Sequence, residues 1–278
     1  MNAEKLKVEH LKNPIGIDFT RPRFSWVCKD GKRQTAHQIL AKCGEEIIWD
    51  TGKVPGSLTY GIPWEGPPLK SREHIDWQVR LWDEIDTPGE WSAPAAFELG
   101  LLSPDDWKAK WINPEWERNP AERQPASYLT KSFRLTEIGT GRLYVTAHGL
   151  YDVWLNGCHV DGYFLAPGNC QVEKRLQVQT YDVSELLQKG ENQILVTLGD
   201  GWYRGSFGYG MQTNTFGEDI ALLLQLEVDG KPAAVTDESW QASQSGPLGL
   251  NDMMKGEEID ARKWPISDWH GVKVRNYG

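Results

Sequence analysis

The sequence has little of what several classes of protein require. Its 278 residues carry no excess of positive charge, because 30 Lys and Arg stand against 39 Asp and Glu, a formal net charge of −9. Nucleic acids and anionic membranes bind basic surfaces, so we expect neither as a partner. Apolar runs are far shorter than the roughly 20 residues of a membrane span, and residues 1–12 are too charged for a secretory signal. We therefore expect a cytoplasmic protein.

Motifs for metals, nucleotides and covalent catalysis are also missing. The six histidines do not cluster, and no HxxxH, P-loop, GxSxG or dinucleotide-binding pattern occurs. The cysteines include no CxxC pair, which argues against a zinc or redox site. We expect reduced thiols, with a disulfide as the less favoured alternative, and we assign no catalytic residue and no metal ligand. The four cysteines are Cys28, Cys43, Cys158 and Cys170.

Aromatic and turn-forming residues are abundant instead. The sequence contains 14 Trp, 28 Gly and 16 Pro, and its aromatic content excludes intrinsic disorder. Residues 75–82 alternate between apolar and polar side chains, which predicts a half-buried strand with Trp77 on its inner face. Similar strand patterns recur about every ten residues without a convincing helix. We therefore predict an all-β chain that begins with a fibronectin type III-like or immunoglobulin-like sandwich, and we expect Trp26 and Trp77 to pack in its core.

A change of pattern near Ser103 predicts a domain boundary. Ser103 is a candidate helix cap with Asp106 three residues later, so we expect a single helical turn there. Further along, Asn156-Gly157 and Asp229-Gly230 are strong hairpin signals between apolar runs. We predict two β-sandwich domains, a fibronectin type III-like domain over residues 1–102 and a jelly-roll-like domain over residues 103–278.

The segment over residues 199–205, Gly-Asp-Gly-Trp-Tyr-Arg-Gly, is the first candidate for binding chemistry. Its glycines permit close approach of a ligand to the backbone. Trp202 and Tyr203 offer flat faces for a sugar ring, and Asp200 and Arg204 offer directional hydrogen bonds. A structural loop with Trp202 in the core explains the same pattern about equally well.

Two other segments are weaker candidates. Residues 161–168, with Asp161 and Tyr163, follow the first hairpin, and a plain connection is favoured there over a ligand site. The second is an acidic turn that could bind a cation or supply the acid and base of glycoside cleavage, although a solvated turn with an internal ion pair is favoured. That turn contains Glu257, Glu258, Asp260 and Arg262.

Short motifs in a fixed order make the sequence recognisable. Those of the first module are residues 13–18, 21–26, 34–40, 49–54 and 77–83, and those of the second are residues 149–151, 155–157, 180–183, 199–205 and 256–262. Each motif is weak alone, but the ordered series is specific and covers nearly the whole chain. It resembles the N-terminal part of bacterial α-L-rhamnosidases of glycoside hydrolase family 78.

The resemblance implies that the glycosidic bond is cut outside these residues. In this family two acidic groups of a following (α/α)₆ barrel cleave the bond with inversion. The sequence to Gly278 contains no such helical pattern, so we expect a non-catalytic accessory fragment of a larger enzyme. Its expected partners are the missing barrel and rhamnose-containing glycosides, with a homodimer left open. A stand-alone sugar-binding module and a purely structural scaffold are the alternatives.

In some relatives the second module binds L-rhamnose with the help of calcium, which makes calcium the cofactor to test for. The sequence departs from the pattern of relatives at two places. Asn169 follows Pro167-Gly168 where relatives usually have an aromatic residue, and Gly162 replaces a second polar residue after Asp161. The residues expected to contact sugar are Asp161, Tyr163, Asp200, Trp202, Tyr203 and Arg204.

Overall fold

The computed structural model describes residues 1–116 and 124–277. Within these residues the chain is nearly all-β and forms two compact units, Met1–Asp106 and Trp107–Gly278. The all-β class with two β domains is thereby confirmed. The 3₁₀-helix η1 (Pro104–Asp106) forms the single turn expected near Ser103, whose backbone N–H donates to Asp106 Oδ2 at 3.0 Å. None of the described helices is long and apolar enough to cross a membrane.

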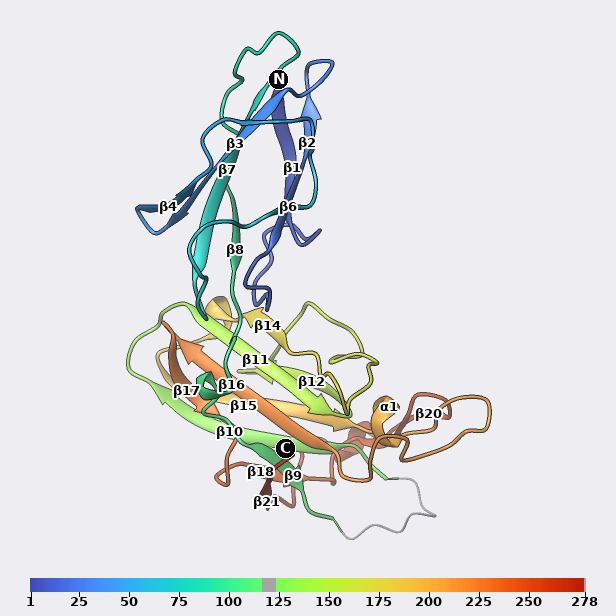
Figure 1. Cartoon of the computed structure of the whole chain (residues 1–278). Coiled ribbons are helices and arrows are strands. Elements are labelled where there is room, and N and C mark those ends of the chain that lie inside the picture. Colours follow the sequence, from blue (N-terminus) through green and yellow to red (C-terminus); the bar gives the residue numbers. More distant parts are fainter. Residues whose placement is uncertain (117–123, 278) are drawn as a thin grey trace. The chain divides into compact units, whose positions relative to one another are not determined.

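The first unit is a sandwich of two antiparallel sheets (Figure 1). One sheet has the strand order β1-β2-β6, and the other has the order β4-β3-β7-β8 with β5 paired to β3. The strands are β1 (Asn2–Val8), β2 (Arg23–Lys29), β3 (Ala36–Cys43), β4 (Glu46–Asp50), β5 (Val54–Pro55), β6 (Ile62–Pro63), β7 (His74–Trp82) and β8 (Ala95–Glu98).

The core of the first unit confirms the alternation that predicted β7. Ile75, Trp77, Val79 and Leu81 are all buried, with 0–1% of each residue's surface exposed. The ring of Trp77 packs edge-on against Phe24 of the opposite sheet, with 4.6 Å between ring centroids. Large rings that interlock in this way fill the space between two sheets, so packing accounts for Trp77 and for the likewise buried Trp26.

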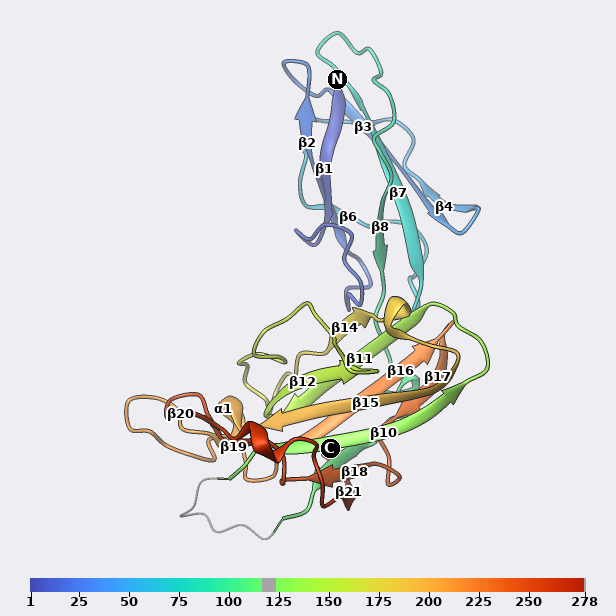
Figure 2. The same ribbon diagram turned by 180° about the vertical axis from the view of Figure 1, so that it is seen from behind.

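The second unit is built on one curled sheet of eleven described strands. Its order is β13-β12-β15-β10-β18-β21-β9-β16-β11-β14 with β17 paired to β16, and β19-β20 form a separate pair. Figure 2 shows the long strands β10 and β15 side by side. The jelly-roll description of this unit stays a prediction. The strands are β9 (Trp111–Pro114), β10 (Ser127–Leu135), β11 (Gly141–His148), β12 (Leu150–Leu155), β13 (Cys158–His159), β14 (Gln179–Asp182), β15 (Gly190–Gly199), β16 (Ala221–Val228), β17 (Lys231–Val235), β18 (Gln241–Ser243), β19 (Leu248–Asp252), β20 (Gly256–Ile259) and β21 (His270–Arg275), and the helices are η2 (Ser184–Leu186), α1 (Gly201–Arg204) and η3 (Ala261–Lys263).

Both predicted hairpins are present in the second unit. Asn156 and Gly157 adopt positive φ angles of 53° and 78° between β12 and β13, and Asp229 and Gly230 adopt 50° and 71° between β16 and β17. Two residues of positive φ match the twist of a tight antiparallel pair. The first turn therefore fixes the register that sets Trp154 opposite His159.

Strand β16 is buried on both faces. Leu222, Leu224 and Leu226 point into the core of the curled sheet. On the other face Gln225 is fully buried, and its Oε1 accepts hydrogen bonds from the backbone N–H groups of Lys108 (2.6 Å) and Ala109 (3.2 Å). The chain that enters the unit thus covers the sheet and satisfies its buried amide.

An aromatic stack covers the end of β11. The imidazole of His148 lies between the rings of Trp111 and Tyr203, with 4.6 Å between centroids on each side. Burial lowers the pKa of His148 to about 4, because the neutral ring loses less hydration than the charged one. His148 is therefore a neutral member of the packed interior.

Truncation of a core side chain of β16 tests how much this packing contributes to the stability of the second unit. Leu224→Ala is expected to lower the free energy of unfolding of the second unit by about 2–5 kcal/mol, since it removes fully buried methyl groups and leaves a cavity. Chemical denaturation followed by circular dichroism measures the change. The exposed Ile138 provides the control, because Ile138→Ala should change stability by less than about 0.5 kcal/mol. Equal effects of the two variants would contradict the assigned core.

The pH dependence of stability tests the His148 stack. Because the pKa of His148 is lowered from 6.5 to about 4 in the folded state, the unfolded chain binds more protons between these values. The free energy of unfolding should therefore fall as the pH falls from 6.5 to 4, by on the order of 3 kcal/mol. His148→Phe should remove this part of the acid sensitivity, and His270→Phe should keep it. An unchanged slope in His148→Phe would refute the assignment.

Candidate functional site

The segment after β15 folds into the single helical turn α1. Gly201 begins it with a φ of +53°, and a Cβ at this position would lie 2.5 Å from Leu150 Cγ. The glycine is thus required by a close approach to the protein's own Leu150. The expectation that the glycines of this segment let a ligand approach the backbone stays a prediction.

Asp200 and Arg204 bind to each other across this turn. Arg204 Nε donates to Asp200 Oδ1 at 2.7 Å, and Arg204 Nη2 contacts the same carboxylate oxygen. The side chains are only 5% and 15% exposed, for Arg204 and Asp200 respectively. The backbone N–H of Asp200 donates to Asn251 Oδ1 at 2.8 Å. These polar groups are engaged within the protein, which gives them a structural role in holding α1.

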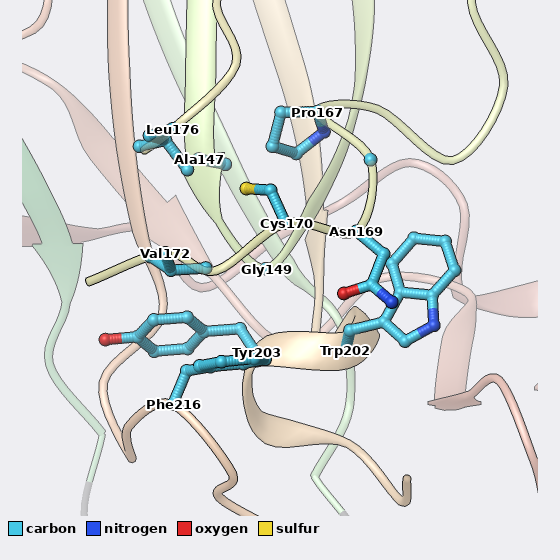
Figure 3. Close-up of a pocket in the computed structure, with 11 residues that line it drawn as sticks. Ala147, Gly149, Pro167, Asn169, Cys170, Val172, Leu176, Trp202, Tyr203 and Phe216 are labelled. Atoms are coloured by element: carbon cyan, nitrogen blue, oxygen red, sulfur yellow. The ribbon is translucent and has the colours of Figure 1, made fainter. Parts of the chain in front are cut away.

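The two aromatic residues of α1 point in different directions. Tyr203 is buried and stacks on His148 with an interplanar angle of 10°, and burial raises the pKa of its hydroxyl. Trp202 is half-buried and lies on the other side of the turn (Figure 3). Of this pair, Trp202 is the one that presents an accessible ring.

A small hollow beside Trp202 brings two distant segments together. Asn169 of the loop after β13 lies around the same hollow as Trp202 (Figure 3). The enclosed volume is about 10 Å³, room for about one water molecule. An indole and a side-chain amide at one opening can stack on a ring and bond its hydroxyls. We call this the Trp202 hollow, and it is lined by Ala147, Gly149, Pro167, Gly168, Asn169, Cys170, Val172, Leu176, Trp202, Tyr203 and Phe216.

A larger groove is lined in part by Gly201 of α1. Its volume is about 670 Å³, within the range of small-molecule sites. Tyr163 is 57% exposed and Phe164 is 96% exposed, so aromatic rings stand free on its wall. We call this the Tyr163 groove, and it is lined by Leu150, Tyr151, Asp152, His159, Tyr163, Phe164, Leu165, Thr197, Gly199, Gly201, Leu248, Asn251, Asp252, Met253, Gly256 and Glu257.

Asp161 is hydrogen-bonded to His159, which lines the groove. Its Oδ1 lies 2.6 Å from Nδ1 of His159, and Nε2 of His159 lies 2.5 Å from Asp152 Oδ1. The hydrogen bonds to Asp161 and Asp152 raise the pKa of His159. One histidine thus joins two carboxylates at the rim, and of these three residues only Asp161 was expected at a binding site.

A buried hydrogen-bond network fixes the far end of the loop that carries Tyr163. The hydroxyl of Tyr151 donates to Gln179 Oε1 at 2.8 Å, and Gln179 Nε2 donates to the carbonyl of Pro167 at 3.1 Å. The backbone N–H of Tyr151 donates to the carbonyl of Ala166 at 3.0 Å. Burial raises the pKa of Tyr151, so its hydroxyl stays protonated and keeps donating. The loop is anchored here while its tip at Tyr163 and Phe164 stays exposed.

The acidic turn near the end of the chain is solvated, as the sequence favoured. Glu257 and Glu258 are exposed, and Asp260 accepts from Arg262 Nε at 2.8 Å and Nη2 at 2.9 Å. Across residues 1–116 and 124–277, no group of three or more His, Cys, Asp or Glu side chains is arranged to hold a metal ion.

The six residues expected to contact sugar fall into four groups. Trp202 and Tyr203 line the small hollow, and Tyr163 lines the groove. Asp200 and Arg204 bind to each other, and Asp161 binds His159. Asn169 and Trp202 are far apart in the sequence and come together only in the folded chain, so no local sequence pattern could predict their contact with the same hollow.

Comparison with known proteins identifies the family. The model of the alpha-L-rhamnosidase N-terminal domain matches residues 136–277, and that of the Rha78A-like, N-terminal immunoglobulin domain matches residues 3–103. An α-L-rhamnosidase of Formosa agariphila is 36% identical over 273 residues, covering 91% of this chain and 30% of the relative.

Solved structures agree with the sequence matches. The α-L-rhamnosidase of Aspergillus terreus superposes with a TM-score of 0.90 at 30% identity, covering 100% of this chain and 34% of that one. The enzyme of Dictyoglumus thermophilum gives a TM-score of 0.86 at 31% identity, covering 99% and 34%. The chain thus spans about a third of the length of these relatives. The resemblance inferred from the ordered motifs is confirmed, and the chain belongs to the α-L-rhamnosidase N-terminal domain family.

Proposed function

We propose that the chain is the non-catalytic N-terminal accessory region of an α-L-rhamnosidase and that its second unit contacts rhamnose-containing glycosides. The observation that carries the sugar contact is the convergence of Trp202 and Asn169 on one hollow. Membership of the family supports the wider role, in which a catalytic domain elsewhere in the enzyme cleaves the glycoside.

The volumes of the Trp202 hollow and the Tyr163 groove determine how a sugar would bind at each. A hollow of about 10 Å³ cannot enclose a sugar ring, so the ring would rest on the open face of Trp202 with a hydroxyl bonded to Asn169. The Tyr163 groove, at about 670 Å³, has room for a whole monosaccharide and part of its neighbour. Such open contacts suit a module that holds or guides a substrate.

A structural scaffold is the second candidate function. Tyr203 and Arg204 are 9% and 6% exposed, and both are engaged by other side chains of the unit. Part of the recognised motif over residues 199–205 therefore serves packing. Under this alternative Trp202 would contact another part of the enzyme instead of sugar.

Titration with methyl α-L-rhamnopyranoside discriminates between these functions. Trp202→Ala should weaken binding roughly two- to tenfold, because a stacked aromatic contact contributes about 0.5–1.5 kcal/mol. Isothermal calorimetry or ligand-observed NMR measures the affinity. Trp264→Ala is the matched control, since Trp264 is exposed and lines neither the hollow nor the groove. No binding by the unaltered chain, or equal affinity in Trp202→Ala, would favour the scaffold.

The chain alone should not release nitrophenol from 4-nitrophenyl α-L-rhamnopyranoside. Glycoside cleavage needs an acid whose pKa is raised and a second carboxylate across the bond. Asp260 is the opposite case, because Arg262 lowers its pKa, and Asp152 and Asp161 are bound to His159. A spectrophotometric assay at several pH values tests this. Release above the blank that is lost in the double variant Glu257→Gln, Glu258→Gln would refute the accessory role.

A further inference from the structure

We propose that Asp152, His159 and Asp161 form a protonation latch that holds the wall of the Tyr163 groove and makes ligand binding there weaken as the pH rises. The ligand rests on the function proposed above, but the latch is a property of this chain alone. We call these three residues the His159 latch.

The hairpin geometry places the three side chains together. Asp152 lies on β12, His159 on β13 and Asp161 just beyond, and the Asn156-Gly157 turn fixes their register. His159 approaches Asp161 with one ring nitrogen and Asp152 with the other, at 2.6 and 2.5 Å. The ring of Trp154 packs edge-on against the imidazole with 5.2 Å between centroids. His159 is thus oriented from three sides.

Two carboxylates at opposite nitrogens require a protonated ring. A neutral imidazole carries one N–H and can satisfy one carboxylate, whereas imidazolium donates to both. Both hydrogen bonds raise the pKa of His159 above its ordinary 6.5. The stabilisation is therefore fully present below pH 6.5 and is lost as the pH rises through the raised pKa.

Loss of the proton from His159 loosens the loop that forms the wall of the groove. Asp161 lies two residues before Tyr163, and the other end of the loop is held by the bonds to Ala166 and Pro167. When His159 is neutral, one carboxylate loses its donor, and the two negative charges repel each other. The lost donor and the repulsion weaken the link between Asp161 and the hairpin while the far end of the loop stays anchored, so the wall becomes more mobile.

The other charged groups of the groove favour the protonated state. The charged residues of its described lining besides the latch are Asp252 and Glu257, which are both acidic. Asp252 accepts backbone N–H groups from Ser206 and Met254, which lower its pKa and keep it anionic. The uncharged titratable neighbours are Tyr151, Tyr163, Tyr181 and Cys158, and burial raises the pKa of Tyr151 and of Tyr181.

NMR of the full chain tests the latch without any ligand. His159 should titrate above 6.5, and Asp152→Asn and Asp161→Asn should each lower its pKa. Amide exchange of residues 162–165, corrected for intrinsic pH dependence, should speed up across this titration and stay fast at all pH values in His159→Gln. His270→Gln, which changes a histidine outside the groove, should leave both readouts unchanged. An ordinary His159 titration, or loop exchange that ignores it, would overturn the latch.

Titration with methyl α-L-rhamnopyranoside at pH 5.5 and 8.5 then tests control of the groove. Affinity should drop on the order of tenfold at the higher pH, as expected when one charge-assisted hydrogen bond is lost, and His159→Gln should remove the difference. Equal affinity at both pH values would overturn the control of binding. Absence of sugar binding at every pH, with the NMR results as expected, would refute the proposed function and leave the latch standing.

Discussion

The conformation of α1, the helical turn after β15, depends on the ion pair of Asp200 and Arg204. Two buried charges are tolerated only when each satisfies the other and further hydrogen bonds complete them. Here the pair joins Asp200, which directly precedes α1, to Arg204, the last residue of α1, and Arg204 Nη1 also donates to the Glu218 carbonyl at 3.4 Å. Successive helical residues project about 100° apart, so Trp202 and Tyr203, which follow Gly201 within the turn, point in different directions (Figure 3). The pair therefore holds the turn on which Trp202 is accessible and Tyr203 packs against His148.

Features set by local rules could be predicted from the sequence. A strand buries every second residue, so the alternation over residues 75–82 was enough to place Trp77 in the core. A tight hairpin needs two residues of positive φ, so Asn156-Gly157 was enough to place its turn. These rules concern neighbours in the chain, and no knowledge of distant packing was needed.

The candidate site depended on contacts that no local rule supplies. Tyr203 is buried because His148, at the end of another strand, stacks on it, and Trp202 meets Asn169 only after a separate loop folds over. His159 is a different case. The two-residue turn sets it opposite Trp154 and brings both carboxylates to the open end of the hairpin, so the register alone could have revealed the latch.

The acidic character of the chain is compatible with an uncharged ligand. It also limits how protonation of His159 can affect the binding of such a ligand. A neutral sugar gains nothing from net charge, so recognition must come from ring faces and hydrogen bonds, which Tyr163 and Phe164 and the groove's carboxylates can supply. The described groove lining carries Asp152, Asp252 and Glu257 against His159, and it stays negative whether His159 is charged or neutral. Proton loss therefore does not reverse an attraction for such a ligand. Its effect on binding must pass through the position of the wall, which the hydrogen bonds of His159 hold.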